Sequence, residues 1–410
     1  MFMTGFKQYY NMKRLVICFF GFFFSQLLAS GQKSGTFTYP TNKNVIRIAV
    51  QASDPNTSLL LKQAFRLHGG LQIVPQPSAA SYSLKFDSIG NNGVRVSIRS
   101  TSGTGTSESF PVQGTDLRQA ALLAADTAVQ RITKRPGFFA GKLAFVVHQG
   151  KVRELYTSDL FFQGFRKLTS DRRQIISPDW SPDGNRILYS GNKSGGMDVY
   201  LMDMGTRVAR PIARYKGTNH GAVFDPFGRR AAMIIKNELC INEAILASRS
   251  KPQRITTNKS RETSPTWSPD GRRIILSSDI EGGAKLFEVI LSGENKGRFR
   301  RIPTNISREC TEPTWNPTDP NILAFTASIG GRSQIVIYDF SKRTSRALDS
   351  NSNDEGPCWT NDGRHLLFSA LKGSSHLLHV VDTVTNKRAP LHTAKSSFSS
   401  PDFVYPRNYR

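Results

Sequence analysis

From residue 142 onward the chain alternates short apolar runs with polar turns. Ile187–Ser190, Val199–Met202 and Ala209–Ile212 are typical runs, and Gly, Asn and Ser residues separate them. Such runs are too short for helices and contain residues that favour a pleated strand. The pattern therefore predicts a strand-rich domain over residues 137–410.

A turn motif recurs along these strands about every 45 residues, which is the length of a β-propeller blade with four short strands. Trp180-Ser181-Pro182-Asp183-Gly184 returns unchanged at residues 267–271, and looser copies complete a set of aromatic positions. These positions, interpreted as a structural hub, are Trp180, Phe224, Trp267, Trp315, Trp359 and Phe403. Pro and Gly in the motif favour a tight turn. We expect each aromatic residue at the end of an innermost strand, in the wedge between neighbouring blades.

The two ends of the repeat predict how the ring closes. Three strand-like runs, Lys142–His148, Glu154–Ser158 and Phe165–Thr169, precede Trp180 without an aromatic turn ahead of them. The last copy, at Phe403, has no strands after it. Joining these ends in one blade would remove the exposed edges of an open ring. The prediction is a six-bladed propeller closed by its C-terminal strand.

Residues 32–136 predict a small α/β domain with the order β-α-β-β-β-α. The expected strands are Val45–Val50, Ser81–Phe86, Val94–Ile98 and Ser107–Val112. The expected helices are Thr57–His68 and Asp116–Thr133, the second capped by Thr115. Residues 32–44 are polar and are expected to form a flexible arm.

The first 31 residues predict a secretory signal peptide. A basic start at Met12-Lys13-Arg14 precedes the apolar run Leu15–Leu28, and Ala29-Ser30-Gly31 provides small residues for cleavage. Met12 would begin a signal of more typical length. The alternative is an uncleaved membrane anchor, for which the apolar run is short.

Cysteine and histidine usage predicts neither a disulfide framework nor a metal site. Cys18 lies in the signal, which leaves Cys240, Cys310 and Cys358, an odd number at unrelated positions. Three free thiols are expected, with a Cys310–Cys358 bridge as the alternative. The histidines are scattered and lack zinc-ligand spacing. No metal or cofactor is expected.

The formal net charge of +24 favours acidic partners, anionic polymers or anionic membrane surfaces. No dense Lys/Arg block is present, and the aromatic residues belong to the repeat. Nucleic-acid binding is therefore not expected. Contact with membranes is expected to be peripheral at most.

The sequence lacks the motifs of common enzymes, so catalysis is not expected. It contains neither a Gly-x-Ser-x-Gly elbow nor a phosphate-binding loop. Five carboxylates lie close to the hub positions, namely Asp179, Glu262, Glu312, Glu355 and Asp402. We interpret them as turn and cap residues facing different directions; the alternative is a ring that holds a cation in the central channel.

Six connections lead into the innermost strands and should emerge on one face of the propeller. We call this face the mouth; it comprises Asp171–Ile176, Lys216–His220, Lys259–Thr263, Ile306–Thr311, Asn351–Glu355 and Lys395–Ser399. A polar mouth around a channel favours a docking surface for another protein. The alternative is a merely solvated rim.

The order of these parts resembles the TolB family, propeller proteins of the Tol–Pal system in Gram-negative envelopes. The closest motifs are residues 176–189 (ISPDWSPDGNRILY), residues 264–271 (SPTWSPDG), Asp198–Asp203 and the ending at residues 400–405. The resemblance implies a non-enzymatic periplasmic adaptor that supports outer-membrane integrity and cell division. It also implies that the mouth binds the peptidoglycan-associated lipoprotein Pal. By position, the Pal-facing residues are Thr218, Asn219, His220, Gly221, Arg261, Glu262, Thr263, Arg308 and Glu309.

The resemblance implies a second partner, TolA, which would pair with the N-terminal arm at residues 32–44. This arm is polar, and no separate apolar strand precedes Val45–Val50. Two other functions stay open. One is a binding module for anionic cell-envelope polymers, and the other is a propeller hydrolase with a metal in its channel.

Overall fold

The computed structural model describes residues 45–101, 107–193, 195–247, 250–392 and 396–406. The predicted signal peptide and the predicted arm at residues 32–44 lie outside these ranges. Within them the protein is mainly β, with a small α/β part followed by a six-bladed propeller. The predicted fold class is confirmed.

The α/β part is a five-stranded sheet in the order β2-β1-β3-β4-β5. Its elements are β1 (Ile46–Ala52), α2 (Pro55–Leu67), β2 (Leu71–Ile73), the short 3₁₀ helix η1 (Pro77–Ala79), β3 (Tyr82–Ile89), β4 (Gly93–Ser100), β5 (Ser107–Gln113) and α3 (Leu117–Thr133). The sequence prediction missed β2, which has three residues and pairs in parallel with β1. It also misplaced the cap of α3, because the carboxylate of Asp116, rather than Thr115, accepts the Gln119 amide at 2.8 Å.

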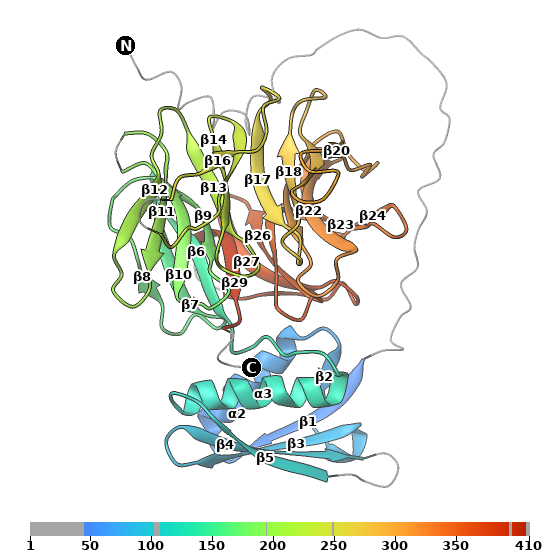
Figure 1. Ribbon diagram of the computed structural model, residues 1–410. Helices are drawn as coiled ribbons and strands as arrows, with labels where there is room; N and C mark the ends of the chain where they lie inside the picture. The colour runs from blue at the N-terminus through green and yellow to red at the C-terminus, as the bar shows by residue number, and fades with distance from the viewer. Residues whose placement is uncertain (1–44, 102–106, 194, 248–249, 393–395, 407–410) are drawn as a thin grey trace, which may run out of the picture. The chain divides into compact units, whose positions relative to one another are not determined.

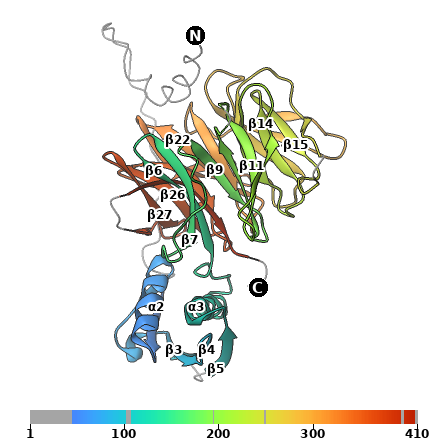
Figure 2. The ribbon, with the colours of Figure 1, turned by 90° about the vertical axis from the view of Figure 1, so that its left-hand side faces the viewer.

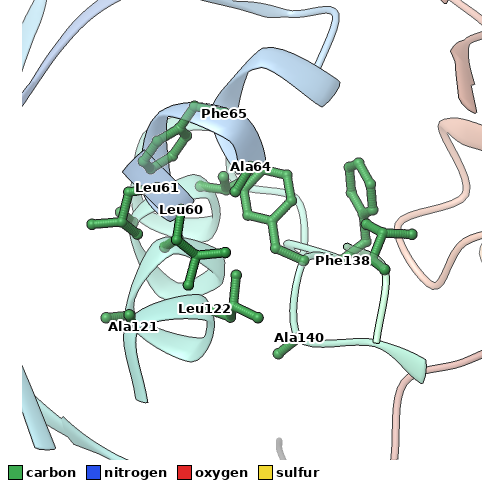
Figure 3. Close-up of a cluster of buried hydrophobic side chains, with 14 of the residues drawn as sticks. Leu60, Leu61, Ala64, Phe65, Ala121, Leu122, Phe138 and Ala140 are labelled. Atoms are coloured by element: carbon green, nitrogen blue, oxygen red, sulfur yellow. The ribbon is translucent and has the colours of Figure 1, made fainter. Parts of the chain in front are cut away.

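Both helices cover the same face of this sheet, as Figure 2 shows. Helix α2 begins at Pro55, whose fixed φ suits the first helical turn, and the Asp54 carboxylate accepts the Thr57 amide at 2.6 Å. Side chains of α2 and α3 then meet in one buried cluster around Leu61, Phe65 and Ala121 (Figure 3). The same cluster includes Leu367 of the propeller, so the two parts share apolar contacts.

Six four-stranded antiparallel sheets form the propeller. The composite blade contains β29 (Ser397–Val404), β6 (Lys142–Gln149), β7 (Val152–Asp159) and β8 (Arg166–Lys167). Blade 1 contains β9 (Ile175–Trp180), β10 (Arg186–Gly191), β11 (Asp198–Asp203) and β12 (Ala209–Ala213). Blade 2 contains β13 (Asn219–Phe224), β14 (Ala231–Ile235), β15 (Glu238–Asn242) and β16 (Gln253–Arg254).

The remaining blades repeat this plan. Blade 3 contains β17 (Glu262–Trp267), β18 (Arg273–Ser278), β19 (Lys285–Ile290) and β20 (Phe299–Arg301). Blade 4 contains β21 (Cys310–Trp315), β22 (Ile322–Ile329), β23 (Arg332–Asp339) and β24 (Thr344–Ala347). Blade 5 contains β25 (Asn353–Trp359), β26 (His365–Lys372), β27 (Ser375–Asp382) and β28 (Arg388–Pro390).

The ring closes by pairing the two ends of the repeat, as predicted. Strand β29 runs antiparallel to β6, with Phe403 opposite Leu143 and Ser397 opposite His148. Figure 1 shows β29, in red, beside the teal β6. Strand β29 also contacts the innermost strands of blades 5 and 1. A sheet that uses both chain ends leaves no open blade edge at the seam.

The hub aromatic residues lie between neighbouring blades. Trp180 shares a buried cluster with Ala144 and Leu155 of the composite blade. Trp359 shares one with Ala324 of blade 4, and its indole N–H donates to the Thr314 carbonyl at 3.1 Å. Each such ring fills the space that opens between two twisted sheets that radiate from one axis.

Every innermost strand contains a bulge that the sequence analysis did not predict. Three residues before each hub aromatic, the backbone adopts a positive φ between 50° and 62° at Ser177, Gly221, Ser264, Glu312, Gly356 and Ser400. The pairing register shifts at these positions in all six sheets. A bulge of this kind bends a strand and increases its local twist.

Among the described residues, neither helix is long and apolar enough to cross a membrane.

Candidate functional site

The mouth is formed where the chain enters the six innermost strands. The opposite ends of these strands hold the hub aromatics, which neighbouring blades bring together through bonds such as Trp267 Nε1 to the Val223 carbonyl at 3.2 Å. The strands run in the same direction around the ring. The entering segments therefore gather at the other end, as predicted.

Backbone hydrogen bonds fix the mouth at the seams between blades. The amides of Asn219, Glu262 and Cys310 donate to carbonyls of the preceding blade at 2.9, 3.0 and 2.8 Å. The acceptors are Met197, Asn237 and Ala284.

Each of the three other seams also has a backbone amide that donates across it, in two cases to a side chain. The Arg153 amide donates to the Arg173 carbonyl at 2.9 Å. The Ser333 amide donates to Asn353 Oδ1, and the His376 amide donates to Ser397 Oγ, each at 3.0 Å. Because every seam is bonded, the mouth is ordered before any partner arrives.

Several of the predicted partner-binding residues are buried beneath the surface of the mouth. Asn219 is fully buried, and its side-chain amide donates to the carbonyls of Tyr215 and Met197 at 2.8 and 3.1 Å. The buried Glu262 carboxylate accepts the Leu239 amide at 2.6 Å, and burial raises its pKa. His220 is 6% exposed, and burial lowers its pKa to about 4. These side chains hold the loops in place.

The accessible members of the predicted set are Thr218, Arg261, Thr263, Arg308 and Glu309. Their backbones are anchored: the Arg261 amide donates to Asp279 Oδ1 at 2.7 Å, and the Arg308 carbonyl accepts Lys285 Nζ. Gly221 is buried in the bulge of β13, where its positive φ suits a residue without Cβ.

The structure adds residues that the sequence analysis did not single out. The turns between the second and third strands of several blades lie beside the entering segments. They contain Lys151, Lys236 and Glu281, and Arg332 follows one of them as the first residue of β23; all four residues are exposed. In a blade of four antiparallel strands, the turn between the second and third strands lies at the end where the chain enters the first strand. The order of the predicted strands was therefore enough to place these turns at the mouth.

Two of the five hub carboxylates meet. Asp179 Oδ2 accepts the Phe224 amide at 2.7 Å, and Asp402 Oδ2 accepts the Trp180 amide at 2.6 Å. Burial raises the pKa of Asp402 to about 6, and burial together with the charge of Asp402 raises the pKa of Asp179. These two carboxylates therefore link three consecutive blades through backbone amides.

The other three hub carboxylates are bonded separately. Glu312 accepts the Gly356 amide at 2.9 Å, Glu355 accepts Ser333 Oγ at 3.0 Å, and Glu262 accepts the Leu239 amide of the preceding blade at 2.6 Å. These three carboxylates accept hydrogen bonds at separate places, which fits the interpretation as residues facing different directions.

Within the described ranges, one group of three side chains has the composition of a metal site: His68, His365 and Asp382. It lies beside the turn between β25 and β26, at the hub end of blade 5 and opposite the mouth. Asp382 is already saturated, since Oδ2 accepts Arg364 Nε at 2.9 Å and Oδ1 accepts the amides of Val384 and Thr385. The adjacent guanidinium also opposes a cation, so these residues do not fit a metal.

The cysteines that the structure describes, Cys240, Cys310 and Cys358, carry free thiols. The expectation of free thiols is confirmed, and the alternative Cys310–Cys358 bridge is wrong. Cys240 and Cys310 are buried, and burial raises the pKa of both thiols. Their environment thus disfavours reactive thiolates.

Comparisons with known proteins place this geometry in a family. The family model described as the TolB beta propeller domain matches residues 129–404. The Tol-Pal system protein TolB of Bordetella pertussis is 31% identical over 209 residues, which are 50% of this chain and 48% of that protein. TolB of Francisella tularensis subsp. mediasiatica is 26% identical over 240 residues, 56% of this chain and 54% of that protein. The chain thus matches about half the length of these curated relatives.

A solved structure shows the same fold over most of the chain. The crystal structure of TolB from Acinetobacter baumannii aligns with a TM-score of 0.77 and 20% identity. The alignment covers 88% of this chain and 97% of that one.

Proposed function

The chain belongs to the TolB propeller family, and on this premise we propose that it is a non-enzymatic adaptor of the Tol–Pal system. It would act in the periplasm after removal of residues 1–31, supporting outer-membrane integrity and cell division. Its partner at the mouth would be the peptidoglycan-associated lipoprotein Pal.

The observation that carries this proposal is the mouth, whose entering segments are hydrogen-bonded at all six seams. An ordered surface loses little conformational entropy when a partner binds. Binding is therefore a use that this geometry favours.

We propose that Thr218, Arg261, Thr263, Arg308 and Glu309 contact Pal directly. Asn219, His220, Gly221 and Glu262 would act through the shape of the loops that they hold. The second proposed partner, TolA, would pair with residues 32–44.

Binding of the soluble domain of Pal from the same bacterium tests the proposal. Thr263 is half-buried at the mouth, so Thr263→Arg adds bulk to the surface without filling the core. We expect Thr263→Arg to weaken binding about tenfold or more, because the bulk of the arginine prevents close docking at this position. This steric effect should exceed the attraction of one added charge that is exposed to solvent. Isothermal titration calorimetry would measure the dissociation constant.

The matched control is Thr344→Arg, the same change on the exposed outer strand β24. It should leave binding unchanged, and both variants should keep the thermal transition of the wild type. An unaltered dissociation constant for Thr263→Arg would place the Pal interface elsewhere. His220→Asp is unsuitable here, because a buried charge would destabilise the fold itself.

A further inference from the structure

We propose that the mouth recognises an acidic protein segment that carries one apolar anchor side chain. The inference rests on the proposed function only in that the mouth is the partner-binding face. It adds the chemistry that a partner must present.

Exposed cations outnumber exposed acids around the mouth. The cations are Lys151, Arg172, Arg173, Lys216, Lys236, Lys259, Arg261, Arg308 and Arg332, whereas the exposed acids are Asp279, Glu281, Glu309 and Asp349. A ring of one sign attracts a partner of the opposite sign and orients it during the encounter.

Most of these acids are already engaged by the protein. Glu281 pairs with Arg301 at 3.0 Å, Asp279 accepts the Arg261 amide, and Glu309 accepts the Ala284 amide at 3.1 Å. The half-buried Asp171 likewise pairs with Lys193 at 3.0 Å. Ion pairing offsets the charge of Glu281 and Asp171, and the exposed cations outnumber the remaining exposed acids, so the mouth offers a mainly positive charge to a partner.

The cations are held on short, fixed turns. Arg172, Lys236 and Lys259 have φ values of 51°, 52° and 59°. Such left-handed residues occur where the surrounding bonds dictate the backbone. The Lys236 amide, for example, donates to the Thr218 carbonyl at 3.0 Å. The positive charges are thus displayed in a defined arrangement, unlike charges on a mobile tail.

A hollow that is partly apolar lies beside Arg308. It has a volume of about 580 Å³ and lies between the segment entering β21 and the β22–β23 turn. Ile306 and Ile329 form its apolar part and pack on the buried core of blade 4. Its polar part is formed by Asn305, Ser307, Arg308, Glu309 and Ser328. Ile280 on the neighbouring β18–β19 turn is 44% exposed. A side chain such as leucine would bury apolar surface here.

This combination favours a protein segment over an anionic polysaccharide. A polysaccharide would satisfy the cations but has no aliphatic side chain to fill the hollow. A peptide of Asp and Glu residues around one leucine satisfies both features, and the apolar contact supplies affinity that salt does not screen.

Fluorescence anisotropy with a labelled peptide of this composition tests the inference. We expect its affinity to fall about tenfold between about 50 mM and about 500 mM NaCl, because the charges are exposed to solvent. A peptide with the leucine replaced by serine should bind about fivefold more weakly. A peptide with lysines in place of the acids should not bind.

Charge reversal locates the binding surface. The double variant Arg261→Glu/Arg308→Glu should weaken the acidic peptide about tenfold or more. The control Arg272→Glu changes an exposed arginine in the β17–β18 turn, at the hub end of blade 3, and should have no effect. Equal binding by the leucine and serine peptides, or by heparin and the leucine peptide, would overturn the inference.

The outcomes separate this inference from the proposed function. If Pal binds at the mouth but neither salt nor the double variant changes its affinity, acidic recognition fails and the adaptor role stands. If the acidic peptide binds as expected while Pal does not bind, the chemistry of the mouth stands and the identity of the partner fails.

Discussion

At the scale of single residues, His365 lies in a buried network of charged groups. It is fully buried, with Nδ1 at 2.6 Å from Asp362 Oδ2 and Nε2 at 3.5 Å from Asp382 Oδ2. Arg364 pairs with Asp382, and the His68 ring lies against His365 at a centroid distance of 4.6 Å. Although burial opposes its charge, Asp362 and Asp382 raise the pKa of His365 to about 9. Burial and the nearby His365 lower the pKa of His68 to about 3.

These pKa shifts predict how stability depends on pH. Between pH 6.5 and about 9 the folded His365 keeps a proton that the unfolded chain has lost. Its contribution is fully present below pH 6.5 and is lost as pH rises through 9. The free energy of unfolding should fall by about 1–3 kcal/mol over this window. Chemical denaturation at a series of pH values measures it.

His365→Gln should make this fall smaller, because glutamine does not titrate. The matched control is His148→Gln. Burial and His376 lower the pKa of His148 to about 4, so His148 is neutral in both states above pH 7. The control should keep the wild-type dependence. A wild-type profile that is flat between pH 6.5 and 9 would contradict the assignment of a charged His365.

At the scale of elements, the bulge in each innermost strand sets the path of the chain past the channel. Four of the six left-handed positions are held by Ser177, Ser264, Glu312 and Ser400, residue types that ordinarily avoid this conformation. Gly221 and Gly356 occupy the other two. Since all six blades keep the same geometry, the packing of the ring imposes the bulge.

Gly356→Ala tests the backbone strain by itself. Gly356 has a φ of 62°, and an added Cβ would meet nothing within 4 Å. The substitution should lower the free energy of unfolding by about 1–2 kcal/mol, the penalty of a left-handed residue with a side chain. Urea denaturation measures the change.

Gly196→Ala is the control for this prediction. An added Cβ at Gly196 would also have room, with its nearest neighbour at 3.9 Å, and Gly196 does not have a positive φ. It should be tolerated or slightly stabilising. Equal effects of the two substitutions would mean that the bulge stores no backbone strain.

The elements also show which structural features can be predicted from the sequence. Hub aromatics, turns and apolar runs are local signals, so the six blades and their closure could be predicted from the chain. The burial of Asn219, His220 and Glu262 could not, because it depends on how neighbouring blades meet. The bulges could not be predicted, because Ser and Glu are not residue types that indicate a left-handed backbone conformation. Strand β2 was missed because its three residues are too few to show an alternation of apolar and polar positions.

At the scale of the whole molecule, the composite blade joins the two ends of the propeller. Phe398 of β29 is 3% exposed and lies at centroid distances of 5.4 Å from Phe145 of β6 and 5.6 Å from Phe162. His392, which follows β28 of blade 5, lies at 4.4 Å. Through this aromatic cluster, β29 packs both against the segment that follows blade 5 and against the rest of its own sheet.

Phe398→Ala should therefore loosen the closure. Removing a buried phenylalanine should lower the free energy of unfolding by about 3–5 kcal/mol. Phe165→Ala is the control, since Phe165 belongs to the same cluster but is 46% exposed, and it should lose about 1 kcal/mol. Similar losses in the two variants, measured in urea, would show that β29 does not depend on this cluster.

The pairing of β29 with β6 also sets the order in which the molecule can fold. Blades 1 to 5 are each contiguous in sequence, so each can form as soon as its own four strands are available. The composite blade must instead bring together strands from the first and last parts of the propeller sequence. Closing this long loop costs conformational entropy. Until β29 arrives, β6 presents an unpaired edge. The half-made ring is thus the species most open to proteases and to pairing with other chains, and the final strand ends that exposure.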